Sequence, residues 1–387
     1  MFRNVVVGIS GGVDSAVAAL LLKNKGFNVR GVFMKNWDIV DEKTTCTGDQ
    51  DFEDAQRVCR HLKIPLIQVN FVKEYWNNVF RQFLEDYESG LTPNPDILCN
   101  RFIKFDNFFE FATSRDKLGA EAIATGHYAR TNFGAYLEKY TPERNAKLLQ
   151  ARDTFKDQTF FLSNIPQRAL KKTMFPLGDL TKDQVKAIAM DSGMGFLLRK
   201  KESTGICFIG HRNFQEFISE YIVSKPGKLI DIDTGNIVGS HNGFHHWTVG
   251  QRCRLSGYPQ PYFIAQKDPN TNNIFVAQGT NNPALFSKRF FTESPYWIDK
   301  SCAPNVDKGF HCKFRFQHTK PLTRCEVKKN PERSNELLVI LERPLRAITP
   351  GQYAVFYSET ECYGCARIIN PICGEKVLES EYEITIS

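Results

Sequence analysis

Short apolar runs alternate with amphipathic segments along the first 165 residues. Each run is a block of Val, Ile, Leu or Ala bounded by polar or glycine residues, which predicts a buried strand. The predicted strands are Asn4 to Ile9, Val29 to Met34, Leu66 to Val69 and Ala122 to Thr125. Between them, helical spacing predicts helices over Asp14 to Asn24, around Phe52, Ala55, Cys59 and Leu62, and over Tyr75 to Tyr87. This alternation predicts a parallel sheet covered on both faces, with ligands at the carboxyl ends of its strands.

The pattern changes twice further along the chain. Residues 166–227 are helical and basic, and they end at Pro226-Gly227. From Lys228 onward, short runs rich in Val, Ile, Phe and Tyr are separated by Gly, Pro and Asn, which predicts an all-β barrel or sandwich. We therefore expect three units, at residues 1–165, 166–227 and 228–387.

Composition narrows the class of protein only modestly. The 387 residues are 42% apolar and 24% charged, and no run approaches the roughly 18 apolar residues of a membrane span, so we expect no membrane attachment. The net charge of +7 is compatible with a polyanionic partner. Eleven scattered cysteines indicate a reducing compartment, with most thiols buried. We expect neither a secretory signal nor a transit peptide in the opening run MFRNVVVGIS, because it is too short for the former and lacks the Arg- and Ser-rich amphipathic stretch of the latter.

A glycine-rich turn, SGGVDS, joins the first predicted strand to the first predicted helix at Ser10 to Ser15. It is not a Walker A loop, because no lysine follows Gly12, and its glycines do not have the GxGxxG spacing. Such glycines allow backbone N–H groups to face an anion, and the helix N-terminus adds positive potential. The alternative is a plain turn with a Ser or Asp helix cap. Its place directly after the first strand favours a phosphate site.

Two cysteines lie in polar loops beside cations. Cys99 belongs to TPNPDILCNRFIKF, where two prolines disfavour a helix and predict a stiff extended loop that also carries Asp96. Arg101 and Lys104 would favour its thiolate. Cys207 follows Ser203-Thr204-Gly205, and its flanking cations are Lys200, Lys201 and Arg212. The other cysteines considered, Cys59, Cys253, Cys302, Cys312 and Cys325, are predicted to be structural.

Taken together, eight stretches resemble the tRNA-specific 2-thiouridylases of bacteria and mitochondria. They are SGGVDS, VFMKNW, TPNPDILCN, ATGHYAR, KDQTFFL, FPLG, STGICFIG and TPGQYAVFY, and they cover nearly the whole chain in order. SGGVDS by itself resembles the pyrophosphate loop (PP-loop) of the ATP pyrophosphatase superfamily. The resemblance implies an α/β fold: a doubly wound, parallel-sheet, HUP-like PP-loop domain, a small helical insert and a C-terminal all-β barrel.

The resemblance also implies a reaction. ATP would adenylate oxygen 2 of the wobble uridine with release of pyrophosphate, and sulfur from a Cys207 persulfide would replace that oxygen, giving 2-thiouridine in tRNAs for Lys, Glu and Gln. Cys99 would attack the terminal sulfur and leave a transient Cys99–Cys207 disulfide, or help to release hydrosulfide. Asp96 would contact the base as a candidate acid or base, and Ser203-Thr204-Gly205 would be a hinge. The implied cofactors are ATP and Mg²⁺, with sulfur from an external relay protein or cysteine desulfurase system.

Matching positions give two sets of expected binding residues. For ATP they are Gly8, Ile9, Ser10, Gly11, Gly12, Val13, Asp14, Ser15, Met34 and Gly126. For tRNA they are Asn94, Pro95, Asp96, His127, Lys156, Asp157, Gln158, Arg315, Phe316 and Gln352. Around Arg315, apolar and basic residues alternate from Phe310 to Gln317, which predicts a strand with one basic face. A face that simply meets water is the alternative there.

Metal binding is not expected. His127 has no cluster of other ligand residues around it in the sequence, and Cys362 to Cys365 is a lone CxxC without a second pair. We therefore expect no structural zinc, and we interpret the CxxC as an incidental surface pair in a β-turn.

Two rival functions differ in what they require. Another PP-loop ATP-dependent ligase or amidotransferase-type synthetase would need no cysteines, and a non-catalytic RNA-binding protein would release no pyrophosphate. For location, KKES before Thr204, the stretch VKEYWNNVF and the mild basicity favour the mitochondrial branch. A bacterial cytoplasm is the alternative, because it suits the abrupt N-terminus.

Overall fold

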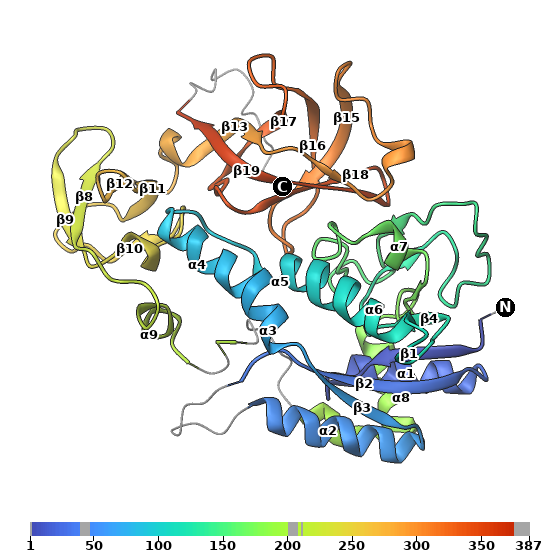
Figure 1. Ribbon diagram of the computed structural model, residues 1–387. Coiled ribbons are helices and arrows are strands. Elements are labelled where there is room, and N and C mark those ends of the chain that lie inside the picture. The colour runs from blue at the N-terminus through green and yellow to red at the C-terminus, as the bar shows by residue number, and fades with distance from the viewer. Residues whose placement is uncertain (1, 39–46, 200–207, 210–211, 375–387) are drawn as a thin grey trace.

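The computed structural model describes residues 2–38, 47–199, 208–209 and 212–374. A layer of helices on a parallel sheet, built mainly by the N-terminal half, lies below two β units built by the C-terminal half (Figure 1). The three parts enclose their own hydrophobic cores, and the largest core lies in the lower layer.

The lower layer is a five-stranded sheet in the order β3-β2-β1-β4-β7, and every neighbouring pair is parallel. Its strands are β1 Asn4–Gly8, β2 Asn28–Lys35, β3 Leu66–Asn70, β4 Ala122–Ala124 and β7 Thr173–Met174. Val5, Val6 and Val7 of β1 are at most 1% exposed, as expected for a central strand covered on both faces. The strand order reverses beside β1, so the loops that follow β1 and β4 meet at the switch point where doubly wound sheets bind ligands.

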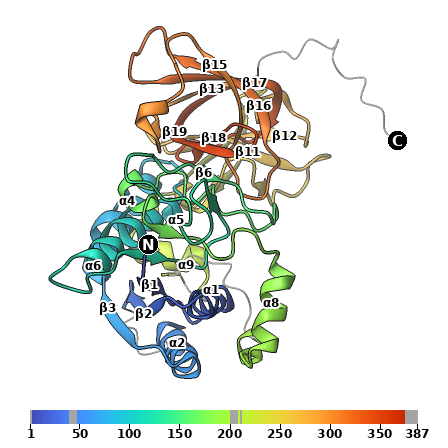
Figure 2. The ribbon, with the colours of Figure 1, turned by 90° about the vertical axis from the view of Figure 1, so that its right-hand side faces the viewer.

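Helices cover both faces of this sheet (Figures 1 and 2). On one face lie α1 Val13–Asn24, α2 Thr47–Leu62 and α8 Lys182–Asp191. On the other face lie two continuous helical stretches, α3 Val72–Tyr75 with η1 Trp76–Phe80 and α4 Arg81–Glu88, and α5 Pro95–Leu98 with η2 Cys99–Asn107 and α6 Phe108–Thr113. The predicted strands and helices of this part are confirmed, with ends shifted by a few residues.

The basic region after residue 165 contains short helices, as predicted, and it also completes the lower layer. Its elements are α7 Gln167–Leu170, β7, α8, η3 Gly195–Arg199 and α9 Phe214–Ser219. β7 pairs with β4, and α8 packs against α1. Across the described ranges, no helix is both long and apolar enough to cross a membrane.

The chain from Gly227 onward forms two sheets. The first has the order β10-β11-β12-β8-β9 and a small core that includes Leu229, Tyr262 and Ile264. Its elements are β8 Gly227–Asp231, β9 Ile237–His241, η4 Phe244–His246, β10 Arg252–Cys253, β11 Tyr262–Asp268 and β12 Asn273–Gln278.

The second sheet is the predicted C-terminal barrel. Six strands in the order β13-β17-β16-β15-β18-β19 close into a ring, because β13 pairs with both β17 and β19. The elements are η5 Pro283–Leu285, β13 Phe286–Thr292, β14 Tyr296–Trp297, η6 Lys300–Cys302, β15 Phe310–Arg315, β16 Thr323–Lys329, β17 Leu337–Arg346, β18 Tyr353–Tyr357 and β19 Glu361–Cys373. Closure removes the exposed edges of the ring.

Two short strands from the first half of the chain join the barrel sheet. They are β5 Arg130–Thr131 and β6 Leu148–Leu149, and β6 pairs with β19 through Leu148 and Cys362. The barrel is therefore tied to the first half of the chain by backbone pairing as well as by side chains, and it lies above the helices that cover one face of the parallel sheet (Figure 1).

Candidate functional site

The SGGVDS turn closes on itself at the start of α1. The Ser15 hydroxyl donates to the Gly12 carbonyl oxygen at 3.0 Å and accepts the Ser10 N–H at 3.1 Å. The Ser10 and Ser15 hydroxyl oxygens lie 3.2 Å apart. The N-cap residue of α1 is Gly12, which has no side chain to accept the first N–H groups of the helix, and this suits an anion-binding loop.

Three more expected ATP residues border this turn. Gly126 follows β4, and a Cβ there would lie 2.7 Å from the Ser15 nitrogen, so only glycine allows this approach. A Cβ on Gly8 would lie 3.4 Å from Met34 Cε, which places Met34 of β2 against the start of the loop. Gly11 has a φ of +75°, a value that favours glycine. The structure thus brings Gly8, Met34 and Gly126 together around one loop.

Lys182 also reaches this loop, and the sequence interpretation missed it. Its Nζ lies 2.7 Å and 2.8 Å from the two carboxylate oxygens of Asp14, and Tyr128 Oη donates to Asp14 Oδ1 at 2.9 Å. Lys182 is only 7% exposed, whereas the loop opens to solvent at Asp14. A signal existed: Thr181 and Gln184 form a capping box, which puts Lys182 at the first position of α8. A lysine there opposes the helix dipole and therefore calls for an acidic partner.

The Pro-rich segment is helical from Pro95 onward, so the prediction of an extended loop through Cys99 is wrong. Asn94 caps α5 by accepting the Ile97 N–H at 3.4 Å, and Pro95 occupies the first turn, where no N–H is needed. Cys99 continues the same helix as the first residue of η2 and is 7% exposed. The helical stretch continues into α6, which packs next to the SGGVDS turn, called the ATP loop below. A Cβ on Gly8, the last residue of β1 before this turn, would lie 3.7 Å from Phe108 Cε1 of α6.

The polar groups beside Cys99 have shifted pKa values. Asp96 is exposed at the surface, yet the protein atoms around its carboxyl raise its pKa, and the opposing effect of the Lys104 ammonium is smaller. Lys104 Nζ lies 3.4 Å from His127 Nε2, and His127 Nδ1 lies 2.9 Å from Thr125 Oγ1. Burial, with Lys104 adding to it, lowers the pKa of His127 well below its usual value. His127 is therefore neutral at physiological pH and positions Lys104 rather than carrying charge.

Cys207 lies outside the described residues, as do Lys200, Lys201 and the expected hinge at Ser203-Thr204-Gly205. Phe208, the next residue, is fully buried in a cluster of aromatic rings. Its ring centroid lies 4.9–6.0 Å from those of Trp37, Tyr75, Phe80, Phe83 and Phe217. Most of these rings belong to the α3–α4 stretch, whose η1 segment packs against α5 and η2. The chain next to Cys207 is therefore anchored to the helix that neighbours the Cys99 helix.

A turn of the barrel holds the Pro-rich segment in place. Gln352 Nε2 donates to the Thr92 and Pro93 carbonyl oxygens at 3.0 Å and 3.2 Å, and Gln352 Oε1 accepts from Asn94 Nδ2 at 3.2 Å. The Thr92 N–H donates to the Pro350 carbonyl oxygen at 2.9 Å. Gln352 therefore acts on the site by positioning Asn94, whatever contact it makes to RNA.

Three of the residues expected to bind tRNA are buried: Asp157 and Arg315 lie between the barrel and the lower layer, and Phe316 lies in the core of the barrel. Asp157 is 0%, Phe316 4% and Arg315 5% exposed. Arg315 Nη2 lies 2.5 Å from Asp157 Oδ2 and 3.1 Å from Tyr357 Oη, which places this ion pair inside the protein. The predicted strand from Phe310 is confirmed, but its alternation of buried and exposed positions ends at Arg315. Contact of Asp157 or Arg315 with tRNA would require this interface to open, and contact of Phe316 would require the barrel core to open.

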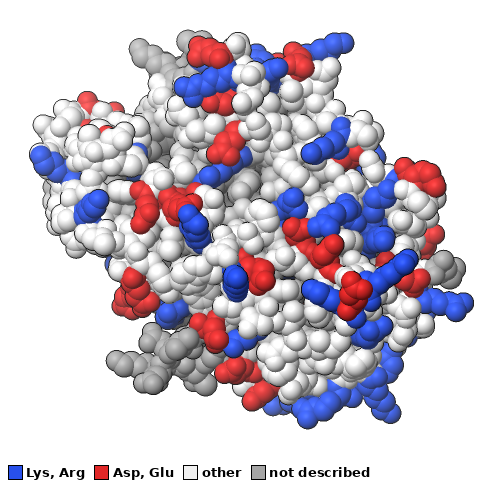
Figure 3. Space-filling view, viewed as in Figure 1, with Lys and Arg blue, Asp and Glu red and all other residues white. Residues whose placement is uncertain are grey.

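Lys156 and Gln158 differ from their neighbour Asp157, because both are only half-buried. Gln158 Oε1 accepts the Tyr128 N–H at 2.9 Å, and the Lys156 N–H donates to Asp153 Oδ1 at 3.1 Å. Charged side chains of both signs cover the face viewed in Figure 3, with Lys and Arg frequent over the loops between β4 and α8. Gln158 is connected to the SGGVDS turn through Tyr128, whose hydroxyl donates to Asp14.

Among the remaining cysteines, Cys362 and Cys365 are not placed as the sequence interpretation expected. Cys362 and Cys365 lie in β19 and are each 1% exposed, so the interpretation as a surface pair in a turn is wrong. Burial raises the pKa of Cys365 to about 12. Cys302 is exposed, whereas Cys59 and Cys253 are buried as predicted. Among the described residues, no group of three His, Cys, Asp or Glu side chains is placed to hold a metal ion.

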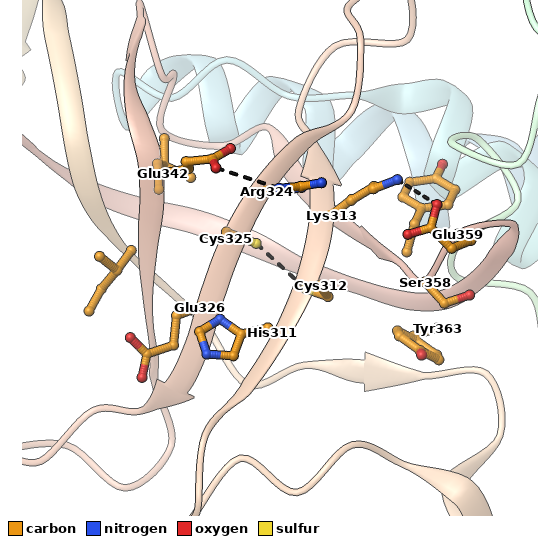
Figure 4. Close-up of a pocket in the computed structure, with 13 residues that line it drawn as sticks. His311, Cys312, Lys313, Arg324, Cys325, Glu326, Glu342, Ser358, Glu359 and Tyr363 are labelled. Atoms are coloured by element: carbon orange, nitrogen blue, oxygen red, sulfur yellow. Dashed lines mark hydrogen bonds and ion pairs between the residues drawn. The ribbon is translucent and has the colours of Figure 1, made fainter. Parts of the chain in front are cut away.

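An open groove of about 640 Å³ lies on the barrel, away from these residues (Figure 4). Cys312 and Cys325 face each other there from β15 and β16, with sulfur atoms 3.5 Å apart. Lys313 pairs with Glu359 at 2.6 Å beside them. None of the expected site residues lines the groove, so the site on the lower layer does not include it.

A PP-loop at the switch point of a doubly wound parallel sheet defines the ATP pyrophosphatase class, here joined to two β units. Family models match in the same order: a tRNA methyl transferase HUP domain at residues 3–211, a tRNA methyl transferase PRC-barrel domain at 215–278 and an aminomethyltransferase beta-barrel domain at 287–368. The chain belongs to the tRNA-specific 2-thiouridylase family, as its similarity to curated relatives shows.

Three relatives illustrate the similarity. Mitochondrial tRNA-specific 2-thiouridylase 1 of Drosophila melanogaster is 57% identical over 96% of this chain and 96% of its own. The Homo sapiens protein of that name is 47% identical, covering 95% and 90%. The tRNA-specific 2-thiouridylase MnmA of Alkaliphilus oremlandii is 45% identical, covering 94% and 96%. Among solved structures, NMN synthetase from Francisella tularensis is 18% identical over 56% of this chain and 72% of its own, with a TM-score of 0.32, which is too low to support an inference.

Proposed function

We propose that this chain uses ATP to adenylate oxygen 2 of the wobble uridine in mitochondrial tRNA and then replaces that oxygen with sulfur. The uridine oxygen bonds to the α-phosphorus as the bond to pyrophosphate breaks. The terminal sulfur of a Cys207 persulfide then bonds to carbon 2, and AMP leaves with the oxygen. The Cys99 thiolate then attacks the Cys207 sulfur and breaks its bond to the sulfur on carbon 2. This releases 2-thiouridine and leaves a Cys99–Cys207 disulfide. A reductant of the thiol class and a donor of persulfide sulfur restore the starting state.

The observation that carries the proposal is the packing of the Cys99 helix on the ATP loop. Phe108 of this helix contacts Gly8, and Lys104 contacts His127 beside Gly126. These contacts support our proposal that activation at the loop and sulfur transfer at Cys99 share one site. Cys99 in this helical stretch and Cys207 in the sequence STGICFIG favour thiolation over the alternative PP-loop ligase, which would need neither cysteine.

The residues of the loop also fit Mg²⁺. The loop offers the Ser10 and Ser15 hydroxyls and the partly exposed Asp14 carboxylate, which binds the Lys182 ammonium in this structure, and hard oxygen ligands of this kind suit that ion. When bound, the ion would neutralise charge on the departing pyrophosphate. The exposed or half-buried Asn94, Asp96, Lys156 and Gln158 are proposed to contact the tRNA, and the mitochondrial relatives support the proposed location.

The test separates the two chemical steps. Purified Cys207→Ser protein should still transfer labelled AMP to unmodified tRNA, while mass spectrometry of the digested tRNA should show no 2-thiouridine. Cys99→Ser should behave in the same way, and Cys302→Ser, which alters an exposed barrel cysteine, is the control. Full thiolation by the Cys207 variant would refute the assignment of the sulfur carrier. Absence of adenylated tRNA in every variant and in the parent protein would refute the reaction itself.

A further inference from the structure

Phe155 is an aromatic side chain exposed to solvent. It is 91% exposed, and among the described residues it is the most exposed large apolar side chain, followed by Val223 at 80%. Exposure of a single apolar residue is common, so exposure alone decides nothing. What distinguishes Phe155 is the construction and the position of the turn that carries it.

The turn around Phe155 is held by hydrogen bonds on every side. Asp153 Oδ1 accepts the N–H groups of Phe155 and Lys156, both at 3.1 Å. Just before the turn, the Arg152 N–H donates to the Gly178 carbonyl oxygen at 2.9 Å. Just after it, the buried Asp157 carboxylate accepts the Ala151 N–H at 3.0 Å. The backbone is therefore fixed before any partner binds, and ordering it on binding consumes little entropy.

The same turn is tied to the ATP loop by two routes. Asp153 Oδ2 accepts the Lys182 N–H at 2.9 Å, and the Lys182 ammonium binds the Asp14 carboxylate. Gln158 accepts the Tyr128 N–H, and the Tyr128 hydroxyl donates to Asp14. Both ends of the segment from Asp153 to Gln158 are thus connected to Asp14, one through Lys182 and the other through Tyr128. Phe155 therefore belongs to a segment that borders the ATP loop.

Two cations flank Phe155 along the chain, while the carboxylates of the same segment are engaged elsewhere, Asp153 with the Lys182 N–H and Asp157 with Arg315. Arg152 is exposed and Lys156 is half-buried, one on each side of Phe155 along the chain. A rigid aromatic ring between cations suits an unstacked nucleobase, whose face stacks on the ring while its phosphates meet the charges. An apolar protein surface would not call for the two cations.

We propose that Phe155 is a stacking platform for an unpaired base of the tRNA anticodon loop and so helps to hold the loop with its wobble uridine over the ATP site. The inference rests on the proposed function, because it takes tRNA to be the substrate. Stacking on Phe155 would add a contact to the face of a base, and this contact does not depend on hydrogen bonds to the edge of that base.

The test compares Phe155→Ala, Phe155→Leu and Phe155→Trp for tRNA and ATP separately. Stacking on one base is worth roughly a tenfold change in affinity, so Phe155→Ala and Phe155→Leu should raise the KM for tRNA about tenfold. The KM for ATP and the rate at saturating tRNA should stay within about twofold of the parent values. Phe155→Trp should restore the KM for tRNA, and binding of an anticodon stem-loop RNA should quench its added fluorescence. Val223→Ala, a second exposed apolar residue, is the control.

Three results would overturn the proposal. The first is an unchanged KM for tRNA in Phe155→Ala. The second is full recovery with Leu, which would indicate apolar contact without stacking. The third is normal adenylation of tRNA together with slower sulfur delivery from a persulfide donor protein, which would make Phe155 a docking point for that protein. Failure of the proposed function is distinguishable, because the parent protein would then adenylate no tRNA at all.

Discussion

The ammonium of Lys182 binds both carboxylate oxygens of Asp14, at 2.7 Å and 2.8 Å, across 168 residues of sequence. The pair joins the first helical position of α8 to the PP-loop, and it balances the negative charge that Asp14 brings to a loop meant for a polyphosphate. Lys182 is thus a positioning residue for the loop.

Replacing Lys182 should impair the use of ATP more than it lowers the stability of the fold. We expect Lys182→Met to raise the KM for ATP at least tenfold, because an unpaired Asp14 repels the phosphates while a nearby cation is lost. The double variant Asp14→Asn with Lys182→Met should be impaired by clearly less than the two single effects combined, since paired charges are coupled. Steady-state adenylation kinetics measure both, with Lys186→Met on the same helix as control. Additive effects would show that the pair is not a functional unit.

Gly351 of the barrel turn should be intolerant of a side chain. Its φ is +91°, and a Cβ would lie 2.7 Å from the Thr92 nitrogen, in the segment that leads to Asn94. Gly351→Ala should therefore displace this segment and lower thiolation, while ATP binding persists. Gly257→Ala is a matched control, because its φ is +86° and nothing lies within 4 Å of its Cβ position. Equal loss in both variants would mean that backbone strain alone is responsible.

The buried pair of Asp157 and Arg315 should stabilise the junction of the barrel with the lower layer. Removing one member leaves a buried charge without its partner, so Asp157→Asn or Arg315→Met should each lower the free energy of unfolding by roughly 3–5 kcal/mol. Lys313→Met breaks the exposed pair with Glu359 on the same strand and should change it by about 1 kcal/mol or less. Urea unfolding measures these differences.

The same variants test the expected RNA contact of Arg315. If its guanidinium stays paired with Asp157, Arg315→Met should leave the salt dependence of tRNA binding unchanged when measured under folded conditions. A decrease in the slope of log affinity against log salt by about one would show that Arg315 binds a phosphate.

His245 should make the small sheet acid-sensitive. Burial, with the positive potentials of His246, Lys267 and His241 adding to it, lowers its pKa from 6.5 to about 4, and its ring is 3% exposed. Between these values the unfolded chain binds a proton that the folded chain does not, so stability is full above about pH 6.5 and falls toward pH 4. The loss should approach about 3 kcal/mol.

Thermal unfolding followed across this pH range measures the effect. His245→Gln should reduce the decline, because the imidazole at position 245 is no longer protonated on unfolding, while the lowered pKa values of His127, His241, His246 and His318 account for the decline that remains. His311→Gln, which alters an exposed histidine of the barrel, is the control. A decline of equal steepness in the His245 variant would assign the acid sensitivity to other groups.

Local sequence alone determined much of this protein. The run Val5 to Val7 is apolar without interruption, so it could only be a strand covered on both faces, and it is the centre of the sheet. The glycines and serines of SGGVDS specify a phosphate turn because backbone freedom and hydroxyl groups are properties of the residues themselves. Strand and helix periods depend on near neighbours, and for that reason they could be predicted.

Only the tertiary structure decided how distant groups meet. Asp14 pairs with Lys182, and Asp157 pairs with Arg315, across more than 150 residues of sequence. Nothing in the residues between them predicts either pair. Asp157 and Arg315 are both charged and read as surface residues, but the way the barrel packs on the lower layer buries them together. Closure of the barrel through β13 and β19 is likewise a long-range pairing. The reason is physical: a charge or a strand edge is stabilised by whatever the fold places beside it, and that partner is set by the packing of whole elements.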